Sequence, residues 1–108
     1  MRFDEKQEIM DKLEYLALKN QLSQTQKQHF LEKITNWKIG TDLQRERYIL
    51  HYGLDISKEK KYTYAELSRL NNCTAANIKG SVLGMRRAIL RLDLKEFQEL
   101  LETVGFKF

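Results

Sequence analysis

The chain of 108 residues carries 19 basic and 15 acidic side chains, 42% hydrophobic residues, one cysteine and no proline. This composition is typical of one globular domain, and it excludes an intrinsically disordered chain or a disulfide-stabilised scaffold. No apolar run approaches the length of a membrane span, and no apolar segment of a signal peptide follows the first residues. We therefore expect a cytoplasmic protein without membrane partners.

Hydrophobic residues recur at helical spacing along the whole chain and predict an all-α fold. Residues 1–40 are expected to form an N-terminal helical pair, with one helix over residues 4–20 and a second between Ser23, as its N-cap, and Gly40, as its terminating glycine. The apolar sides of these two helices are formed by Ile9, Leu13, Leu16 and Ala17 and by Phe30, Leu31, Ile34 and Trp37.

Residues 41–92 begin with a predicted third helix from the capping Thr41, with Gln44 three residues on, to Gly53. Its apolar residues are Leu43, Ile49, Leu50 and Tyr52. A polar loop over residues 55–61 follows. Thr63 then caps a short fourth helix over residues 64–71, in which Leu67 and Leu70 are expected to point inward.

Thr74 is the predicted N-cap of a fifth helix over residues 75–91. Its apolar stripe is formed by Ile78, Val82, Met85, Ile89 and Leu92. Asp93 caps a C-terminal helix within residues 93–108, which Gly105 closes and whose apolar residues are Leu94, Phe97, Leu101 and Val104. We expect the three segments of the chain to form one compact domain.

The fourth helix, a turn of three or four residues and the longer fifth helix have the plan of a helix-turn-helix. Ser68 would be the small residue at the helix crossing, Asn72 the residue in the turn and Ile78 the buried contact. In this motif the second helix lies in the major groove of DNA. Residues 41–92 carry ten basic and five acidic residues, and no acid lies between Leu67 and Leu92. Such a local excess of positive charge is typical of a nucleic-acid-binding surface.

The segment from Arg45 to Leu50, followed by Tyr52, Gly53 and Leu54, resembles the start of region 4 in the sigma-70 family of transcription factors. The stretch from Thr63 to Ser68, and then Thr74, falls in register with the next family element. The resemblance covers residues 41–92. It implies that the fifth helix binds promoter DNA and that the domain docks on RNA polymerase. Residues 1–40 do not resemble the sigma region that opens promoters, so we expect a sigma-like regulator of a phage or mobile element.

The candidate DNA-binding residues are of two kinds. The first kind lies at the start of the fifth helix, where Asn77 suits adenine and the alanines suit a thymine methyl group: Thr74, Ala75, Ala76, Asn77 and Lys79. The second kind consists of cations that would contact phosphates: Arg86, Arg87, Lys60, Lys61, Arg45 and Arg47. The alternative is a solvated helix face for the cations of the fifth helix and a solvated loop for Lys60 and Lys61. Arg45 and Arg47 would otherwise pair with Glu46 and Asp42, and Arg91 with Asp93 or Glu96.

Ala75 and Ala76 stand where the sigma family usually carries charged or amide residues. They favour an alternative function, a protein-interaction module that binds RNA polymerase or a sigma factor without contacting DNA. The amphipathic helices at the two ends would serve either as core or as a homodimer interface. His29, His51 and Cys73 lack zinc-site spacing, and no glycine-rich phosphate loop is present, so we expect neither a cofactor nor enzymatic activity.

Overall fold

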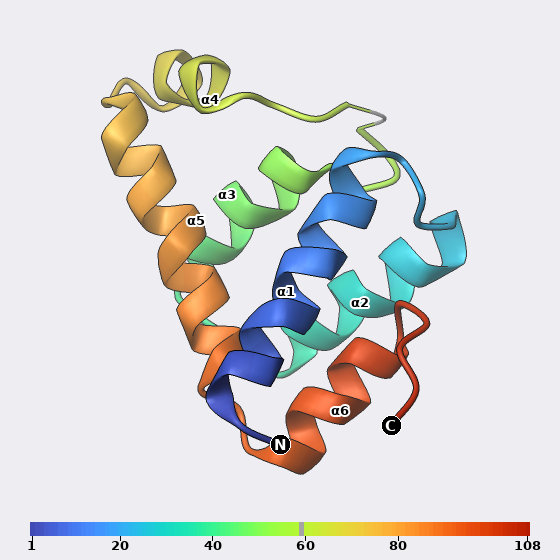
Figure 1. The fold of residues 1–108 in the computed structure, drawn as a ribbon. Helices are drawn as coiled ribbons and strands as arrows, with labels where there is room; N and C mark the ends of the chain where they lie inside the picture. Colours follow the sequence, from blue (N-terminus) through green and yellow to red (C-terminus); the bar gives the residue numbers. More distant parts are fainter. Residues whose placement is uncertain (59) are drawn as a thin grey trace.

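Across residues 1–58 and 60–108, six α-helices follow one another in the order that the sequence predicts (Figure 1). The computed structural model describes residues 1–58 and 60–108, and this part of the chain contains no strand, which confirms the all-α prediction. The helices are α1 (Phe3–Leu18), α2 (Gln24–Asn36), α3 (Asp42–Tyr52), α4 (Tyr64–Asn71), α5 (Ala75–Leu90) and α6 (Leu94–Glu102). None of these described helices combines the length and the hydropathy needed to cross a bilayer.

Local hydrogen bonds fix where the helices begin, and the predicted caps are confirmed. In each case the side chain accepts a bond from the backbone N–H three residues on, which satisfies one of the unpaired donors of the first turn. The capping residues are Ser23, Thr41, Thr63, Thr74 and Asp93. At the starts of α2, α3 and α4 the bond is reciprocated by the side chains of Gln26, Gln44 and Glu66.

The prediction that Gly40 ends the second helix is wrong. Helix α2 ends at Asn36, and Lys38 takes the left-handed conformation with φ of 53°. The Ile39 N–H then bonds to the Ile34 carbonyl at 3.1 Å, which closes the helix in the manner of a Schellman motif. Gly40 also has a positive φ, but it belongs to the connection before α3, where a Cβ would lie 2.8 Å from the Met85 sulfur.

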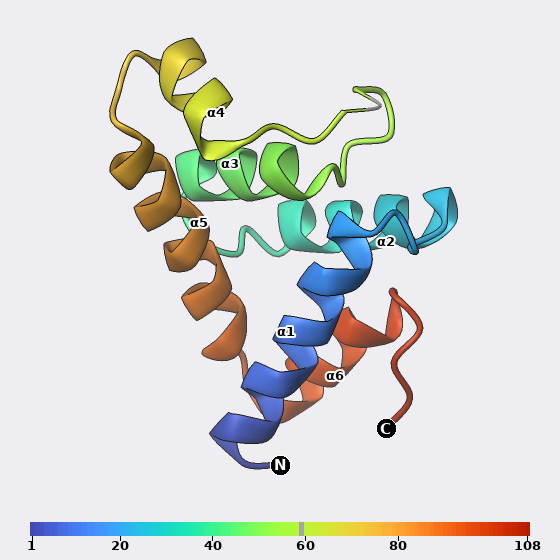
Figure 2. The same cartoon turned by 45° about the horizontal axis from the view of Figure 1, so that its top comes forward.

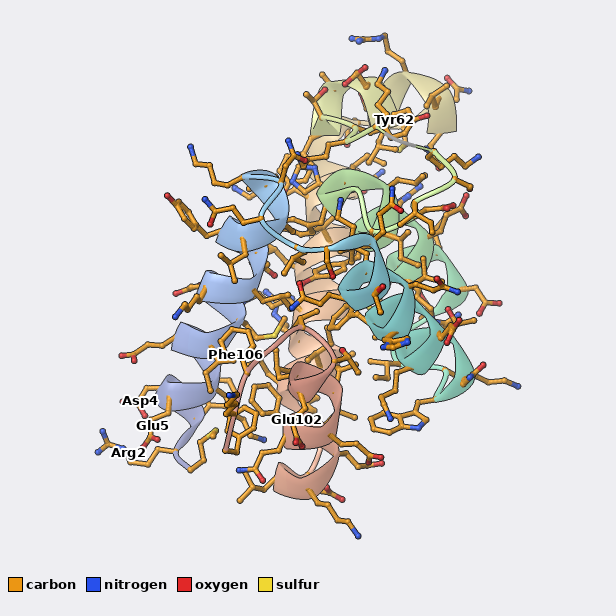
Figure 3. The ribbon with its side chains drawn as sticks, turned by 90° about the vertical axis from the view of Figure 1, so that its right-hand side faces the viewer. Arg2, Asp4, Glu5, Tyr62, Glu102 and Phe106 are labelled. Carbon is orange, nitrogen blue, oxygen red and sulfur yellow. The ribbon has the colours of Figure 1, made fainter. Side chains whose placement is uncertain are left out.

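Helix α5 packs chiefly against α3 and α4, so the predicted helix-turn-helix forms one unit with the helix before it (Figures 1 and 2). Its predicted stripe is buried at Ile78, Val82, Met85 and Ile89, and Leu92 is partly buried. The two N-terminal helices use different partners, because α1 packs on α3 and α5 whereas α2 packs on α3 and α6. The C-terminal segment with Phe106 folds back beside α1 and α6 (Figure 3).

Leu70, which was expected to point inward, is exposed, and so are two other leucines of the predicted helices, Leu43 and Leu94. At the start of α3 the residue after Leu43, Gln44, contacts α5, and its amide lies against Gly84. Helix α4 has only eight residues and buries Leu67 alone, so Leu70 remains 68% exposed. Helical spacing identifies an apolar stripe, but it does not reveal where along the stripe a neighbouring helix stops.

A polar network joins α1 to α5. The Arg86 guanidinium donates to Asp11 Oδ1 at 2.6 Å and to Glu14 Oε1 at 2.7 Å, and it also donates to the Gln7 carbonyl oxygen at 3.2 Å. Glu14 accepts a further bond at 2.9 Å from the Tyr48 hydroxyl of α3. Burial raises the pKa of Tyr48, and the Glu14 charge raises it further, so this hydroxyl stays protonated as a donor. The network therefore ties three helices together.

We predict that Arg86→Ala lowers the free energy of unfolding by about 2–4 kcal/mol, because it leaves the largely buried Glu14 carboxylate without its cation. Arg87→Ala is the matched control, since Arg87 is exposed on the same helix, and its effect should stay within about 0.5 kcal/mol. Urea denaturation followed by circular dichroism measures both values. Equal stabilities of the two variants would show that the network does not stabilise the fold.

Candidate nucleic-acid interface

Helices α4 and α5 are joined by a tight turn in which each residue has a defined task. Asn72 adopts the left-handed conformation with φ of 51°, as its predicted place in the turn requires. The Cys73 N–H bonds to the Ser68 carbonyl oxygen at 3.0 Å, and the Thr74 hydroxyl accepts from the Asn77 N–H at 3.1 Å. Together these bonds end α4 and start α5 within three residues.

The turn is held from behind by Arg47 of α3. This side chain is only 9% exposed, and its guanidinium donates to Ser81 Oγ of α5 at 2.8 Å. It also reaches Asn71 Oδ1 at 3.4 Å and Cys73 Sγ at 3.8 Å. No ion pair with an acid forms among the described residues, and Arg47 Nε is buried without a hydrogen-bond partner. A residue predicted to contact phosphate is therefore an internal brace.

His51 positions the start of α4. In the sequence this residue was considered only as a metal ligand, and that role was rejected. Its Nδ1 lies 2.8 Å from the Tyr62 carbonyl oxygen, which requires a proton on that nitrogen. Its ring stacks on Tyr64, with ring centroids 4.2 Å apart and planes 16° from parallel. The Tyr62 N–H in turn bonds to the Leu50 carbonyl oxygen at 3.1 Å. The chain that enters α4 is thus fastened to α3.

The start of α5 carries the predicted base-contacting residues, and all of them are exposed: Thr74, Ala75, Ala76, Asn77 and Lys79. Gly80 lies on the same outer side, and a Cβ added there would meet nothing within 4 Å. Leu83, one turn further on, is 38% exposed. The first two turns of α5 therefore present a surface of small side chains that another molecule can approach closely.

Three cations on α4 and α5, and a fourth directly after α5, form neither an ion pair nor a side-chain hydrogen bond within residues 1–58 and 60–108. They are all exposed, and they comprise Arg69, Lys79, Arg87 and Arg91. The alternative pairing of Arg91 with Asp93 or Glu96 is accordingly not formed in this part of the chain. Arg69 was overlooked as a candidate because it precedes the turn, although its place in the acid-free stretch from Leu67 to Leu92 was a usable signal.

The other predicted phosphate contacts are engaged elsewhere. Arg86 belongs to the network with α1, and Arg45 folds back onto Asp42 Oδ1 at 2.9 Å and onto the Ile39 carbonyl oxygen at 3.1 Å. Lys60 pairs with Glu66 at 2.8 Å, and its hydrogen bond lowers the pKa of Glu66 to about 2. Lys61 donates to Asn20. The candidate surface therefore contains fewer cations than the sequence suggests.

In the described part of the chain, no three His, Cys, Asp or Glu side chains gather closely enough to hold a metal ion. Comparison with protein-family models, with curated proteins and with solved structures finds no match in any of the three searches. The evidence for this interface is therefore the geometry of α4, the turn and α5 in this chain.

We predict opposite outcomes for two alanine substitutions on α5. Gly80→Ala should raise the free energy of unfolding by about 0.5–1 kcal/mol, because alanine favours the helix and the new methyl group meets no atom. At Gly84 the same methyl group would collide with Gln44, whose amide also caps α3. Because the gain in helix propensity is the same, Gly84→Ala should be less stable than Gly80→Ala by about 1–2 kcal/mol.

Chemical denaturation of both variants beside the wild type measures this difference directly. The methyl group of Gly80→Ala lies on the outer surface of α5 and leaves the core unchanged. If the two variants are equally stable, Gln44 is not held against α5 as described.

Proposed function

We propose that this protein binds duplex DNA and regulates transcription, with the start of α5 in the major groove. The observation that carries the proposal is a capped helix-turn-helix whose second helix begins with exposed residues. In such motifs the N-terminal residues of the second helix contact base edges, and the first helix lies across the phosphate backbone. The resemblance of residues 41–92 to sigma region 4 supports promoter DNA as the target.

The roles follow from exposure. Asn77 and Lys79 are the exposed polar residues in the first turns of α5, so they would contact base edges or the nearest phosphates. Arg69 and Arg87 would contact phosphates on either side, because their guanidinium groups lack partners in the described chain. Arg86 is not part of this proposal, since its charge is matched by Asp11 and Glu14.

The small residues at the start of α5 suit close contact with a groove. The methyl groups of Ala75 and Ala76 can touch a thymine methyl group, and Gly80 allows the helix backbone itself to approach DNA. The unpaired N–H groups of the first turn favour a phosphate at this end of the helix. Recognition would then depend on shape and on few charges.

A second candidate function is binding to a protein such as RNA polymerase or a sigma factor. Two exposed leucines favour it, because Leu70 on α4 is 68% exposed and Leu83 on α5 is 38% exposed. Apolar side chains exposed together often mark a protein-binding surface. Both candidates use the outer side of α4 and α5, and a DNA-binding measurement separates them.

We predict that the wild-type protein binds duplex DNA in fluorescence anisotropy, with an affinity that falls steeply with salt. Lys79→Ala and Arg87→Ala should each weaken binding about fivefold and reduce the salt slope by about one, because each removes one phosphate contact. Lys95→Ala is the control, since Lys95 is an exposed lysine on α6, at the other end of α5. Its affinity should equal that of the wild type within about twofold.

The absence of duplex binding at low salt would exclude the DNA-binding proposal and favour the protein partner. Equal losses in Lys95→Ala and in the two α5 variants would mean that only net charge matters. In either case the start of α5 would not be a DNA-contacting surface.

A further inference from the structure

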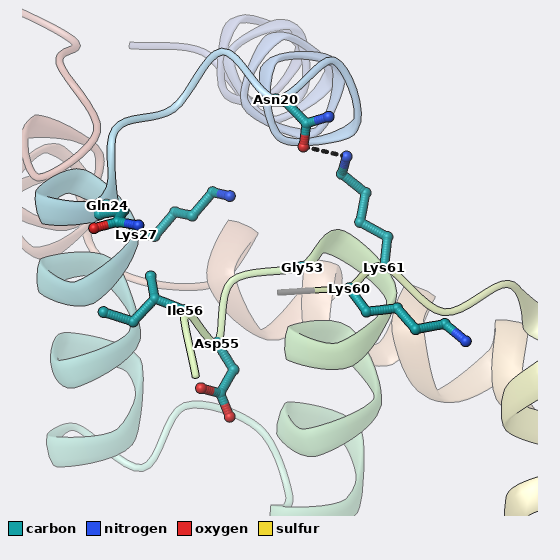
Figure 4. A pocket seen from close by; sticks show the side chains of 8 residues that line it. All are labelled: Asn20, Gln24, Lys27, Gly53, Asp55, Ile56, Lys60 and Lys61. Carbon is teal, nitrogen blue, oxygen red and sulfur yellow. Dashed lines mark hydrogen bonds between the residues drawn. The ribbon is translucent and has the colours of Figure 1, made fainter. Parts of the chain in front are cut away.

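A hollow of about 260 Å³ lies where the turn between α1 and α2 meets the connection between α3 and α4 (Figure 4). The side chains of Asn20, Gln24, Lys27 and Lys61 line it, together with Gly53 and Asp55. Figures 1 and 2 show this region well away from the start of α5. The proposed DNA-binding surface therefore does not account for it.

Two lysines, Lys27 and Lys61, line this hollow, where the described lining holds one carboxylate, that of Asp55. Neither Lys27 nor Lys61 forms an ion pair within residues 1–58 and 60–108. Burial lowers the pKa of Lys61, and the positive charge of Lys27 lowers it further. Two like charges that face one hollow repel each other, and a bound anion would relieve that repulsion.

The other charged groups of the described lining already have hydrogen-bond partners. The Asp55 carboxylate accepts bonds from the backbone N–H and the hydroxyl of Ser57, at 3.0 and 2.6 Å. Lys60 lines the hollow as well, but its ammonium group turns outward and pairs with Glu66 (Figure 4). The charged groups of the described lining without an ion pair are therefore the two ammonium groups of Lys27 and Lys61 and the carboxylate of Asp55, so positive charge predominates.

Polar donors and the backbone complete an anion-binding arrangement. Asn20 accepts the Lys61 bond through its oxygen, which leaves its amide N–H groups unused among the described residues, and Gln24 is the first residue of α2. The start of a helix adds a partial positive charge. Gly53 has a φ of 64°, and a Cβ there would lie 2.7 Å from Lys61 Cγ, so glycine lets the Lys61 stem cross this point.

We propose that this hollow binds a phosphate group through the ammonium groups of Lys27 and Lys61 and the side-chain amides of Asn20 and Gln24. Lysine serves as a mobile point charge for phosphate, and the amide N–H groups can donate to the remaining oxygens. Pyrophosphate, a nucleoside phosphate and a backbone phosphate of DNA offer the same oxygen atoms. The site stands independently of the DNA-binding proposal for α5.

The test is isothermal titration calorimetry with pyrophosphate at low ionic strength. We expect wild-type binding that Lys27→Gln and Lys61→Gln each weaken about tenfold or more, because each removes one charge-assisted bond. Lys95→Gln, which removes an exposed lysine outside the hollow, should leave it unchanged. Circular dichroism checks that each variant is folded, and Lys27→Gln alone decides the result if Lys61→Gln unfolds. Absent binding, or equal weakening by Lys95→Gln, overturns the proposal.

A second measurement identifies the source of the phosphate. If Lys27→Gln loses affinity for duplex DNA as Lys79→Ala does, the hollow holds a backbone phosphate. If Lys27→Gln loses only pyrophosphate, the ligand is a small phosphate compound. Pyrophosphate binding together with an absence of duplex binding would reject the proposed function of α5 and retain this site.

Discussion

The geometry of the α4–α5 turn depends on one buried cation, Arg47. Burial of a guanidinium without a carboxylate costs free energy that its bonds to Ser81, Asn71 and Cys73 offset only in part. The apolar contacts between α3 and α5 must supply the rest. The bonds of Arg47 link α3, the turn and α5 at one point. A charge held in this interior is also screened less by salt than a surface charge, so it adds positive potential behind the start of α5.

Arg86 shows the opposite solution for a cation on the same helix as Ser81. It is neutralised by Asp11 and Glu14 of α1, and it contributes attachment of the N-terminal helix rather than surface charge. Both arginines are counted as basic in the sequence, yet neither offers a free charge at the surface. The ten basic residues of segment 41–92 therefore overstate the charge available to a ligand. A count of basic residues therefore describes the charge of a surface only when the ion-pair partners of those residues are known.

Whether a residue's partners are near or far along the chain explains which features of the fold and site could be predicted from the sequence. Helix starts were predicted correctly because a cap is local, as at Thr63 and Thr74, where the side chain bonds to the backbone three residues away. The end of α2 was misplaced because Lys38 takes a conformation that glycine or asparagine usually adopts. The fates of Arg47 and Arg86 were not predictable, since their partners lie 24 to 79 residues away in the chain. The order of helices follows from the sequence, whereas the composition of the site required the structure.

The cations that lack partners in the described part of the chain set a physical limit on how α5 can bind DNA. The three of them that we assign to DNA, Arg69, Lys79 and Arg87, would release about three counterions on binding, which corresponds to a modest salt slope and weak non-specific affinity. Most of the binding free energy must then come from close contact along the small side chains of Ala76 and Gly80. A partner whose surface does not fit this part of α5 would bind only weakly. A helix of this kind discriminates by fit, and its partner, whether a DNA groove or a protein, must be complementary in shape.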